Sequence, residues 1–358
     1  MRKMLSVLLV VGMMVSLTAC GGNSAGNTTA ADTADVAETE QKKEVDAKPA
    51  VEGNAVKIQI GYEMNPGEPM DIACQKWKEL IEEKSGGNMT VELFPSSQLG
   101  SKDDLMDQMI AGEAVITTGS AGYFADRGAP DMGITFGPYM FENWDQLDKV
   151  LASDWWKKQC GLLEENGLKV LTSWHFGERH TMTTKPVQSA ADFKGMKIRV
   201  PGNKIQVKGF EILGAAPIPM ALGEVYTSLQ QGTIDGLENP LSTLYAGKYQ
   251  EVAKYLILDG HIKDFTSWAC GNTFFNSLTP EQQEILVSSA EEAGVLNNEL
   301  AEKAHAEALE NMKKEGVTVT EPDFEELREA TKDFYELDDF KSIWSADLYD
   351  KIQGIINE

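Results

Sequence analysis

The stretch VKIQIGYEMNPGEPMDIACQKWKELIEEKSGGNMTVELF, residues 56–94, decides the fold class. Its first seven residues alternate apolar with polar or small side chains, which is the period of a β-strand. Residues 69–84 predict a helix that ends at Ser85-Gly86-Gly87. The side chains expected on its buried face are Ile72, Ala73, Trp77, Leu80 and Ile81. A second strand follows at residues 89–94, so the segment predicts a β-α-β unit.

The pattern continues toward the C-terminus. After a turn at residues 95–97, the sequence predicts a helix over 101–111 and a strand over 114–118. Strands that alternate with helices in this way are typical of a parallel sheet with helices packed on it.

A second α/β unit begins at residues 196–200. The sequence then predicts a helix over 204–213, a short strand at Ile218, a helix over 223–231 and a strand over 233–236. Two such units predict two lobes, with a cleft where the carboxyl ends of the strands meet. We expect lobe 1 to comprise residues 55–176 with about 265–300, and lobe 2 residues 177–264 with about 301–358.

A long helix is predicted between Thr279 and Gly316. Thr279-Pro280-Glu281-Gln282 fits a capping box with proline at the first helical position. At 1.5 Å per residue the helix would extend roughly 54 Å, so we expect it to brace both lobes. The alternative is two shorter helices broken at Gly294.

The first residues are typical of an export signal. Arg2 and Lys3 precede the apolar run 4–17, which is short for a membrane span. Leu17-Thr18-Ala19-Cys20-Gly21 resembles the lipobox of bacterial lipoproteins. We therefore expect a signal peptide over 1–19, a lipidated Cys20, and a disordered tether over 20–54, since residues 21–54 lack Leu, Ile, Met and aromatic side chains.

Charge and composition exclude several functions. The 358 residues carry 32 Lys+Arg against 56 Asp+Glu, a formal charge of −24, so nucleic acid is not an expected partner. None of the four His forms an HExxH motif, and no P-loop or GxGxxG occurs. Cys74, Cys160 and Cys270 fall on elements predicted to pack, so inert thiols are expected. We expect no enzyme activity, no cofactor and no metal.

Two arginines are candidates for binding an anion. Arg179 lies in the segment WHFGERH, residues 174–180, and Arg199 ends a predicted strand just before Pro201-Gly202. A guanidinium presents a planar set of donors that suits a carboxylate. The ordinary alternative for Arg199 is a solvated charge at a strand end. Trp174, His175 and Glu178 could add stacking and hydroxyl contacts, unless Trp174 is packed in the interior.

Four consecutive motifs make the chain similar to a known family. They are FKGMKIRVP (193–201), LGAAPIPM (213–220), EVYTSLQQG (224–232) and IDGLENPL (234–241), with weaker matches at 94–100 and 252–256. The chain resembles the DctP-type solute-binding proteins of tripartite ATP-independent periplasmic (TRAP) transporters. The resemblance implies a two-lobed α/β fold of the periplasmic-binding-protein type.

The resemblance also implies roles for single residues. Arg199 corresponds to the carboxylate anchor, Arg179 to a second guanidinium and Asn239 to an amide that hydrogen-bonds the ligand. Ser120 stands where sialic-acid-binding members have Glu, and Leu222 where they have an aromatic residue; both differences weaken a sialic-acid assignment. In the first loop of the binding site, either Glu63 or Asn65 would line the cleft.

The function implied is capture of a small organic acid, a C4-dicarboxylate or a sugar acid, followed by closure and delivery to a membrane permease. The protein would be a monomer, held by its lipid on the extracytoplasmic face of the cell membrane. A sensory binding lipoprotein of the same fold is one alternative. A cell-surface hydrolase that uses His175 and Glu178 is another.

Overall fold

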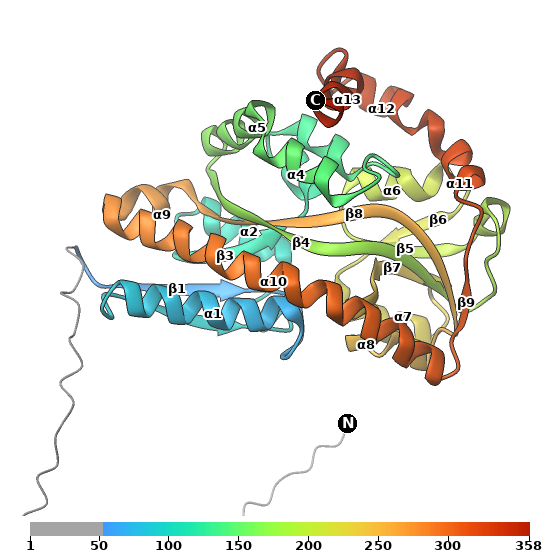
Figure 1. Cartoon of the computed structure of the whole chain (residues 1–358), viewed down its shortest axis with the longest axis horizontal. Coiled ribbons are helices and arrows are strands. Elements are labelled where there is room, and N and C mark those ends of the chain that lie inside the picture. Colours follow the sequence, from blue (N-terminus) through green and yellow to red (C-terminus); the bar gives the residue numbers. More distant parts are fainter. Residues whose placement is uncertain (1–52) are drawn as a thin grey trace, which may run out of the picture. The chain divides into compact units, whose positions relative to one another are not determined.

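The computed structural model describes residues 53–358, which form a nine-stranded mixed sheet with helices on both faces (Figure 1). The predicted signal peptide, Cys20 and nearly all of the predicted tether lie outside the described residues. Their lipoprotein character therefore stays a prediction.

The first α/β unit has the predicted order of elements. It consists of β1 (Val56–Gly61), α1 (Pro69–Lys84), β2 (Met89–Phe94), α2 (Lys102–Ile110) and β3 (Val115–Gly119). β1 pairs in parallel with both β2 and β3. The prediction that Ile72 lies on the buried face of α1 is wrong, because this residue is 38% exposed. The other four expected residues, Ala73, Trp77, Leu80 and Ile81, are buried, and the buried face also includes Met70 and Cys74.

The second unit is also parallel. It consists of β5 (Lys197–Val200), α6 (Lys204–Glu211), β6 (Ala216–Pro219), α7 (Val225–Gln230) and β7 (Gly236–Pro240). The strand predicted over 233–236 begins only at Gly236. The reason is that the backbone N–H of Thr233 closes a turn onto the Ser228 carbonyl, while that of Asp235 bonds the Lys197 carbonyl beyond the end of the ladder.

Two long antiparallel strands join the units into one sheet. β4 (Leu168–Thr183) and β8 (Tyr255–Gly271) pair along their length, β3 adds to β8 and β7 adds to β4. The order is β2-β1-β3-β8-β4-β7-β5-β6, and β9 (Thr318–Thr320) pairs with β8. The β4–β8 register shifts between His175 and Gly177, near the proposed lobe boundary. That boundary itself stays a prediction.

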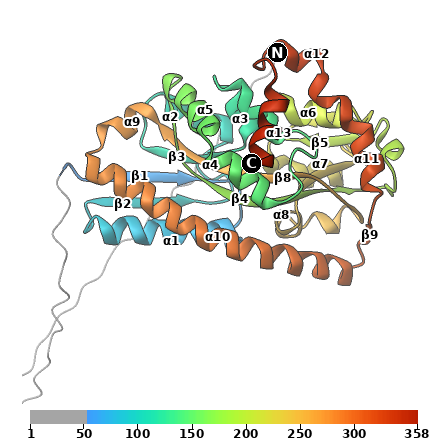
Figure 2. The same ribbon diagram turned by 45° about the horizontal axis from the view of Figure 1, so that its top comes forward.

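Helix α10 (Pro280–Lys314) is continuous, so the alternative of two helices is wrong. The capping box is present, with Thr279 accepting from the Gln282 N–H at 3.2 Å. Figures 1 and 2 show α10 running from the α1 side of the sheet to α8 (Leu241–Ala246), in the second unit. Gly294 is required where the helix meets β4: a Cβ there would lie 2.5 Å from the Trp174 indole.

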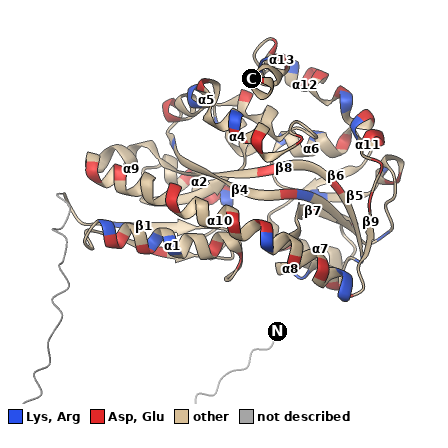
Figure 3. Ribbon diagram, viewed as in Figure 1, with Lys and Arg blue, Asp and Glu red and all other residues tan. Residues whose placement is uncertain are grey.

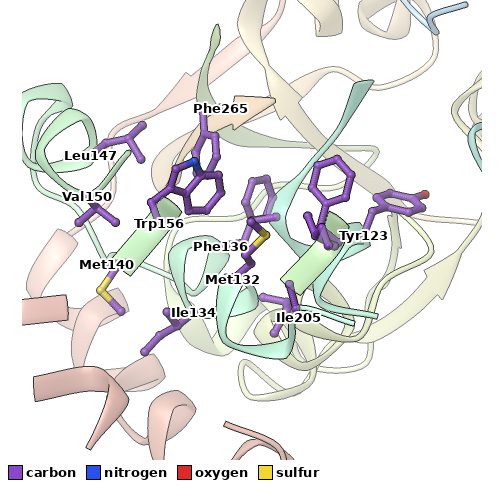
Figure 4. Packing of buried hydrophobic residues seen from close by; sticks show 14 of the residues in the cluster. Tyr123, Met132, Ile134, Phe136, Met140, Leu147, Val150, Trp156, Ile205 and Phe265 are labelled. Atoms are coloured by element: carbon purple, nitrogen blue, oxygen red, sulfur yellow. The ribbon is translucent and has the colours of Figure 1, made fainter. Parts of the chain in front are cut away.

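Shorter helices cover the opposite face and complete the core. Residues of α3 (Ala121–Ala125), α4 (Trp144–Ala152) and α5 (Asp154–Glu165) pack with Phe265 of β8 in the cluster drawn in Figure 4. The C-terminal helices α11 (Phe324–Thr331), α12 (Asp338–Lys341) and α13 (Leu348–Asn357) close the same side, and α9 (Asn272–Ser277) precedes α10. Within residues 53–358, five short 3₁₀ helices lie at 130–136, 190–193, 222–224, 249–251 and 332–336.

Charged residues lie both on the outer helices and on the central strands, and the cysteines of residues 53–358 are unpaired. Figure 3 shows acidic and basic residues interleaved over the outer helices, with both signs also on the central strands β4 and β8. Across residues 53–358 the three cysteines are unpaired, and burial raises the pKa of Cys160 and Cys270 to about 12. In the same range we find no helix both long and apolar enough to pass through a bilayer.

Candidate ligand-binding site

One cavity collects residues from the carboxyl ends of strands in both α/β units. Its lining includes Glu63 after β1, Ser120 after β3, Arg199 and Pro201 at the end of β5, and Asn239 on β7. The empty space between these side chains, including the part open to solvent, is about 560 Å³. This arrangement agrees with the expected convergence of strand ends at a binding site.

Arg199 is a buried cation without an anionic partner. Its side chain comes from β5, and the residue is 3% exposed. Nε and Nη2 donate to the Met220 carbonyl at 3.0 and 2.7 Å, whereas Nη1 has no hydrogen-bond partner and no carboxylate lies within 4.0 Å of the guanidinium among residues 53–358. Burial lowers the pKa of Arg199, because water no longer solvates its charge. The cavity therefore contains a cation that no carboxylate contacts directly, although Glu63 and Glu238 act on it from a greater distance.

Arg179 differs because it is already paired. Its guanidinium, from β4, donates two hydrogen bonds to the Glu238 carboxylate and one to Asp264. Burial alone would lower the pKa of Arg179, but the two carboxylates outweigh that effect and raise it. Burial raises the pKa of Asp264 to about 6, against the opposing effect of Arg179. Arg179 thus forms one wall of the cavity with its charge compensated.

Glu238 belongs to a buried series of charged residues that do not line the cavity. His261 Nε2 lies 3.3 Å from Glu238, and its Nδ1 lies 3.1 Å from Asp259. Burial would lower the pKa of His261, but these carboxylates raise it to about 9. Arg179 and His261 likewise outweigh the effect of burial on Glu238 and lower its pKa to about 2. His261 thus helps to hold the Glu238 carboxylate in position, and Glu238 in turn orients the Arg179 guanidinium.

A second cation whose charge is already paired is Lys102, the first residue of α2. Lys102 Nζ is 2.7 Å from the Glu63 carboxylate and 4.9 Å from the centre of the Tyr123 ring. Burial disfavours both charges, yet each stabilises the other: the pKa of Glu63 is lowered and that of Lys102 is raised. Both side chains are therefore charged at neutral pH.

Several polar atoms of residues that line the cavity have no hydrogen-bond partner in the described part of the chain. The Ser120 hydroxyl and Asp264 Oδ1 are buried and make no hydrogen bond within residues 53–358. No other described group hydrogen-bonds the Asn239 side-chain amide, although Asn239 is 3% exposed. Buried polar groups are normally satisfied, so these atoms are available to a ligand.

Apolar side chains form the rest of the wall. Leu222 lies at the start of the 3₁₀ helix after β6, and Phe176 belongs to β4. Phe136 and Tyr123 line the cavity and also belong to the packed cluster of Figure 4. This part of the cavity is therefore held by the core itself.

The structure brings together Arg199, Arg179, Asn239, Glu63, Ser120 and Leu222 but leaves out four expected residues. Asn65 accepts a hydrogen bond from Ser96 at 3.0 Å, outside the cavity, so Glu63 is the first-loop residue. Trp174 does not line the cavity; it is buried and donates to the Ala290 carbonyl of α10 at 3.0 Å. The packed alternative therefore describes Trp174.

His175 and Glu178 also lie away from the cavity. His175 stacks on Trp144 with ring centroids 4.4 Å apart and bonds Asp148 at 2.8 Å. Glu178 pairs with Lys263 at 2.7 Å. The side chains of β4 that enter the cavity are Phe176 and Arg179, because the register shift at Gly177 changes which residues face inward. Across residues 53–358 no group of three or more His, Cys, Asp or Glu is arranged to hold a metal ion.

Sequence reasoning missed several lining residues. The lining also includes Met64, Met70, Lys102, Thr118, Tyr123, Phe136, Phe176, Gln206, Asp264 and Thr266. Asp264 and Thr266 belong to β8, a strand that the sequence pattern did not reveal. Lys102 follows the helix cap Ser101, where a lysine is usually a solvated charge.

A known protein family matches most of the chain. The family model described as bacterial extracellular solute-binding protein, family 7 (DctP) matches residues 60–341. The chain belongs to this family, the DctP-type solute-binding proteins of TRAP transporters, as its motifs predicted. The curated 2,3-diketo-L-gulonate-binding periplasmic protein of Escherichia coli is 33% identical over 266 residues, which is 74% of this chain and 81% of that protein.

Two solved structures are similar along nearly their whole length. A TRAP solute-binding protein from Ochrobacterium anthropi with bound L-fuconate superposes with a TM-score of 0.82 at 39% identity, covering 85% of this chain and 100% of that one. One from Actinobacillus succinogenes with bound L-galactonate has a TM-score of 0.81 at 38% identity, covering 84% and 99%. The predicted α/β two-lobed fold is thereby confirmed.

Proposed function

We propose that this protein captures a small organic acid, a sugar acid above all, by pairing the ligand carboxylate with Arg199. One observation carries the proposal. Arg199 lines the cavity, is only 3% exposed, and has no carboxylate partner among residues 53–358. A buried charge without compensation is costly, so an anion that enters the cavity removes an unfavourable feature of the unliganded protein.

The arrangement of donors supports a carboxylate in particular. Nη1 and the remaining hydrogen of Nη2 of Arg199 are available, while the Met220 carbonyl holds the guanidinium plane in place. The amide of Asn239 adds a further donor at the end of β7. A planar set of donors suits a planar carboxylate in two-point binding.

The sugar-acid class is supported by both the lining and the relatives. Unpartnered polar atoms of Ser120 and Asp264 can bond hydroxyl groups. Related structures contain L-fuconate and L-galactonate, and the Escherichia coli relative binds 2,3-diketo-L-gulonate by its name. All three are polyhydroxy or keto acids with one carboxylate.

Closure around the ligand is supported by where the lining originates. Glu63 and Ser120 come from the first unit, whereas Arg199 and Asn239 come from the second, so a bound acid joins the two. Glu68, before α1, also accepts a hydrogen bond from Thr243 of α8 at 3.3 Å. A ligand that contacts both units shifts the population toward the closed form.

Delivery to a permease is supported by the family match, and a lipid anchor by the N-terminal sequence. The closed protein would dock on a TRAP permease, and lipid on Cys20 would hold it at the extracytoplasmic face of the membrane. Mass spectrometry of the membrane fraction tests the lipid: a diacylglyceryl-modified Cys20 is expected, and an unmodified chain cut elsewhere would contradict it.

A thermal-shift screen tests the binding function. Aldonates, uronates, keto acids, C4-dicarboxylates and sialic acid are compared with sugar alcohols of the same chain length. A true ligand at a hundred times its dissociation constant adds about 2.7 kcal/mol of stability, so its melting shift should be several degrees. Equal shifts from an acid and its matching sugar alcohol would contradict the role of the carboxylate.

A further inference from the structure

The three cations that line the cavity differ in whether the protein already neutralises them. Arg179 bonds both Glu238 and Asp264, and Lys102 pairs with Glu63 at 2.7 Å. Arg199 alone among the three has no carboxylate within 4.0 Å in the described part of the chain. The cavity therefore has one cation, Arg199, that is not already paired and can bind a ligand anion.

Two of the residues that line the rest of the cavity, Glu63 and Asp264, carry carboxylates. Asp264 Oδ1 is buried and makes no hydrogen bond within residues 53–358, while Oδ2 of the same carboxylate accepts from Arg179. The Glu63 carboxylate lines the cavity and uses Oε2 for Lys102. A ligand hydroxyl placed beside these oxygens can donate to them. A ligand carboxylate in the same place would set anion against anion.

We propose that the cavity selects acids with a single negative charge and several hydroxyl groups, and that Glu63 enforces this choice by keeping Lys102 occupied. This inference rests on the proposed function, because it takes Arg199 as the site of the ligand carboxylate. It assigns polyhydroxy monocarboxylates as the substrate class and excludes C4-dicarboxylates and aldarates. Glu63 and Asp264 accept hydrogen bonds from the hydroxyl groups of the ligand, and removal of the Glu63 charge frees Lys102 for a second anion.

Matched ligand pairs test the selection by charge. Each pair has the same carbon chain and differs only at the far end: galactonate and galactarate, gluconate and glucarate, mannonate and mannarate. Isothermal titration calorimetry with the wild-type protein should give a tightest monocarboxylate that binds at least tenfold more strongly than its dicarboxylate partner. Succinate and malate should bind more weakly still.

The Glu63→Gln variant tests the assigned residue. Glutamine keeps the size and one oxygen but removes the charge, so the preference for the monocarboxylate should fall at least tenfold. The control is Glu92→Gln, which breaks an ion pair of similar length with Lys57, 2.8 Å, on the exposed side of β2. Its preference should match the wild type. The wild-type comparison stands even if Glu63→Gln does not fold.

The outcomes separate this inference from the proposed function. A dicarboxylate that binds as tightly as its matched monocarboxylate, and is lost on Arg199→Met, overturns the inference and leaves the proposed function intact. Tight binding of the best acid that survives Arg199→Met overturns the proposed function. A folded Glu63→Gln protein with an unchanged preference overturns the role of Glu63. Failure of every acid in both series to bind overturns both proposals.

Discussion

The Arg199 guanidinium is oriented by the carbonyl oxygen of Met220, which accepts from Nε at 3.0 Å and from Nη2 at 2.7 Å. A carbonyl fixes the plane of the guanidinium but carries no net charge to neutralise it. The side chain is thus positioned before a ligand arrives, and its charge is left for the ligand. Preorganisation of this kind reduces the entropy lost on binding.

Replacement of this arginine should separate stability from binding. Arg199→Met removes a buried cation that has no carboxylate partner, so the free energy of unfolding without ligand should stay the same or rise. Affinity for the acid should fall by about 3 kcal/mol or more, because the ligand carboxylate loses its partner. Urea denaturation and calorimetry measure the two effects. Lys57→Met, which removes an exposed cation, is the control and should leave affinity unchanged.

Glu238 should contribute chiefly to the stability of the folded protein. Glu238→Gln takes one of two anionic partners from the buried Arg179 and should lower the free energy of unfolding by about 3 kcal/mol. The control Glu92→Gln breaks an exposed pair and should cost less than about 1 kcal/mol. Chemical denaturation of both variants measures the difference. Equal losses would show that the buried network does not depend on this charge.

His261 predicts how stability depends on pH. Its pKa is about 9 in the folded protein against 6.5 for an ordinary histidine, so the folded state holds the proton more tightly. The stabilisation is complete below pH 6.5 and is lost as the pH rises from 6.5 to 9. The stability difference between wild type and His261→Gln should therefore shrink over this window, by up to about 3 kcal/mol.

The control for that pH profile is His180→Gln. Burial lowers the pKa of His180, so this side chain is neutral above pH 6.5 and its contribution should not change there. Urea unfolding at pH 6, 7, 8 and 9 gives both profiles. A constant difference between wild type and His261→Gln across this range would mean that His261 is not held protonated by Asp259 and Glu238.

Two glycine substitutions should have opposite effects. Gly294→Ala places a Cβ 2.5 Å from the Trp174 indole, so it should destabilise by about 1–3 kcal/mol even though alanine favours helix. Gly161→Ala, in α5, meets nothing within 4 Å and should stabilise by about 0.5–1 kcal/mol. Thermal unfolding distinguishes them. Stabilisation by both would show that Trp174 does not need the close approach.

Local patterns in the sequence were enough to predict the two parallel units and α10. Strand and helix periods and the capping box at Thr279 are properties of neighbouring residues. The β4–β8 pairing was not predictable in this way, because it joins residues such as Thr181 and Ile257 that are far apart in the chain. A periodic pattern among neighbouring residues carries no information about which distant strand they pair with.

The site was predictable to the extent that motifs mark it. The motif around Arg199 and the segment around Asn239 carry the resemblance, and both residues line the cavity. The places of Lys102 and Asp264 in the site were not predicted, because they depend on pairing with Glu63 and Arg179 in the folded structure. Trp174 was ambiguous for the same reason: it is packed because it is buried and donates to the Ala290 carbonyl of α10, which is far away in the sequence.

A crystal structure with the tightest acid from the screen tests the central claim most directly. The carboxylate oxygens should lie about 2.7–2.9 Å from the nitrogens of Arg199, with the hydroxyl end toward Glu63 and Asp264. A ligand whose carboxylate binds Lys102 instead, or a neutral group seated on Arg199, would contradict the account.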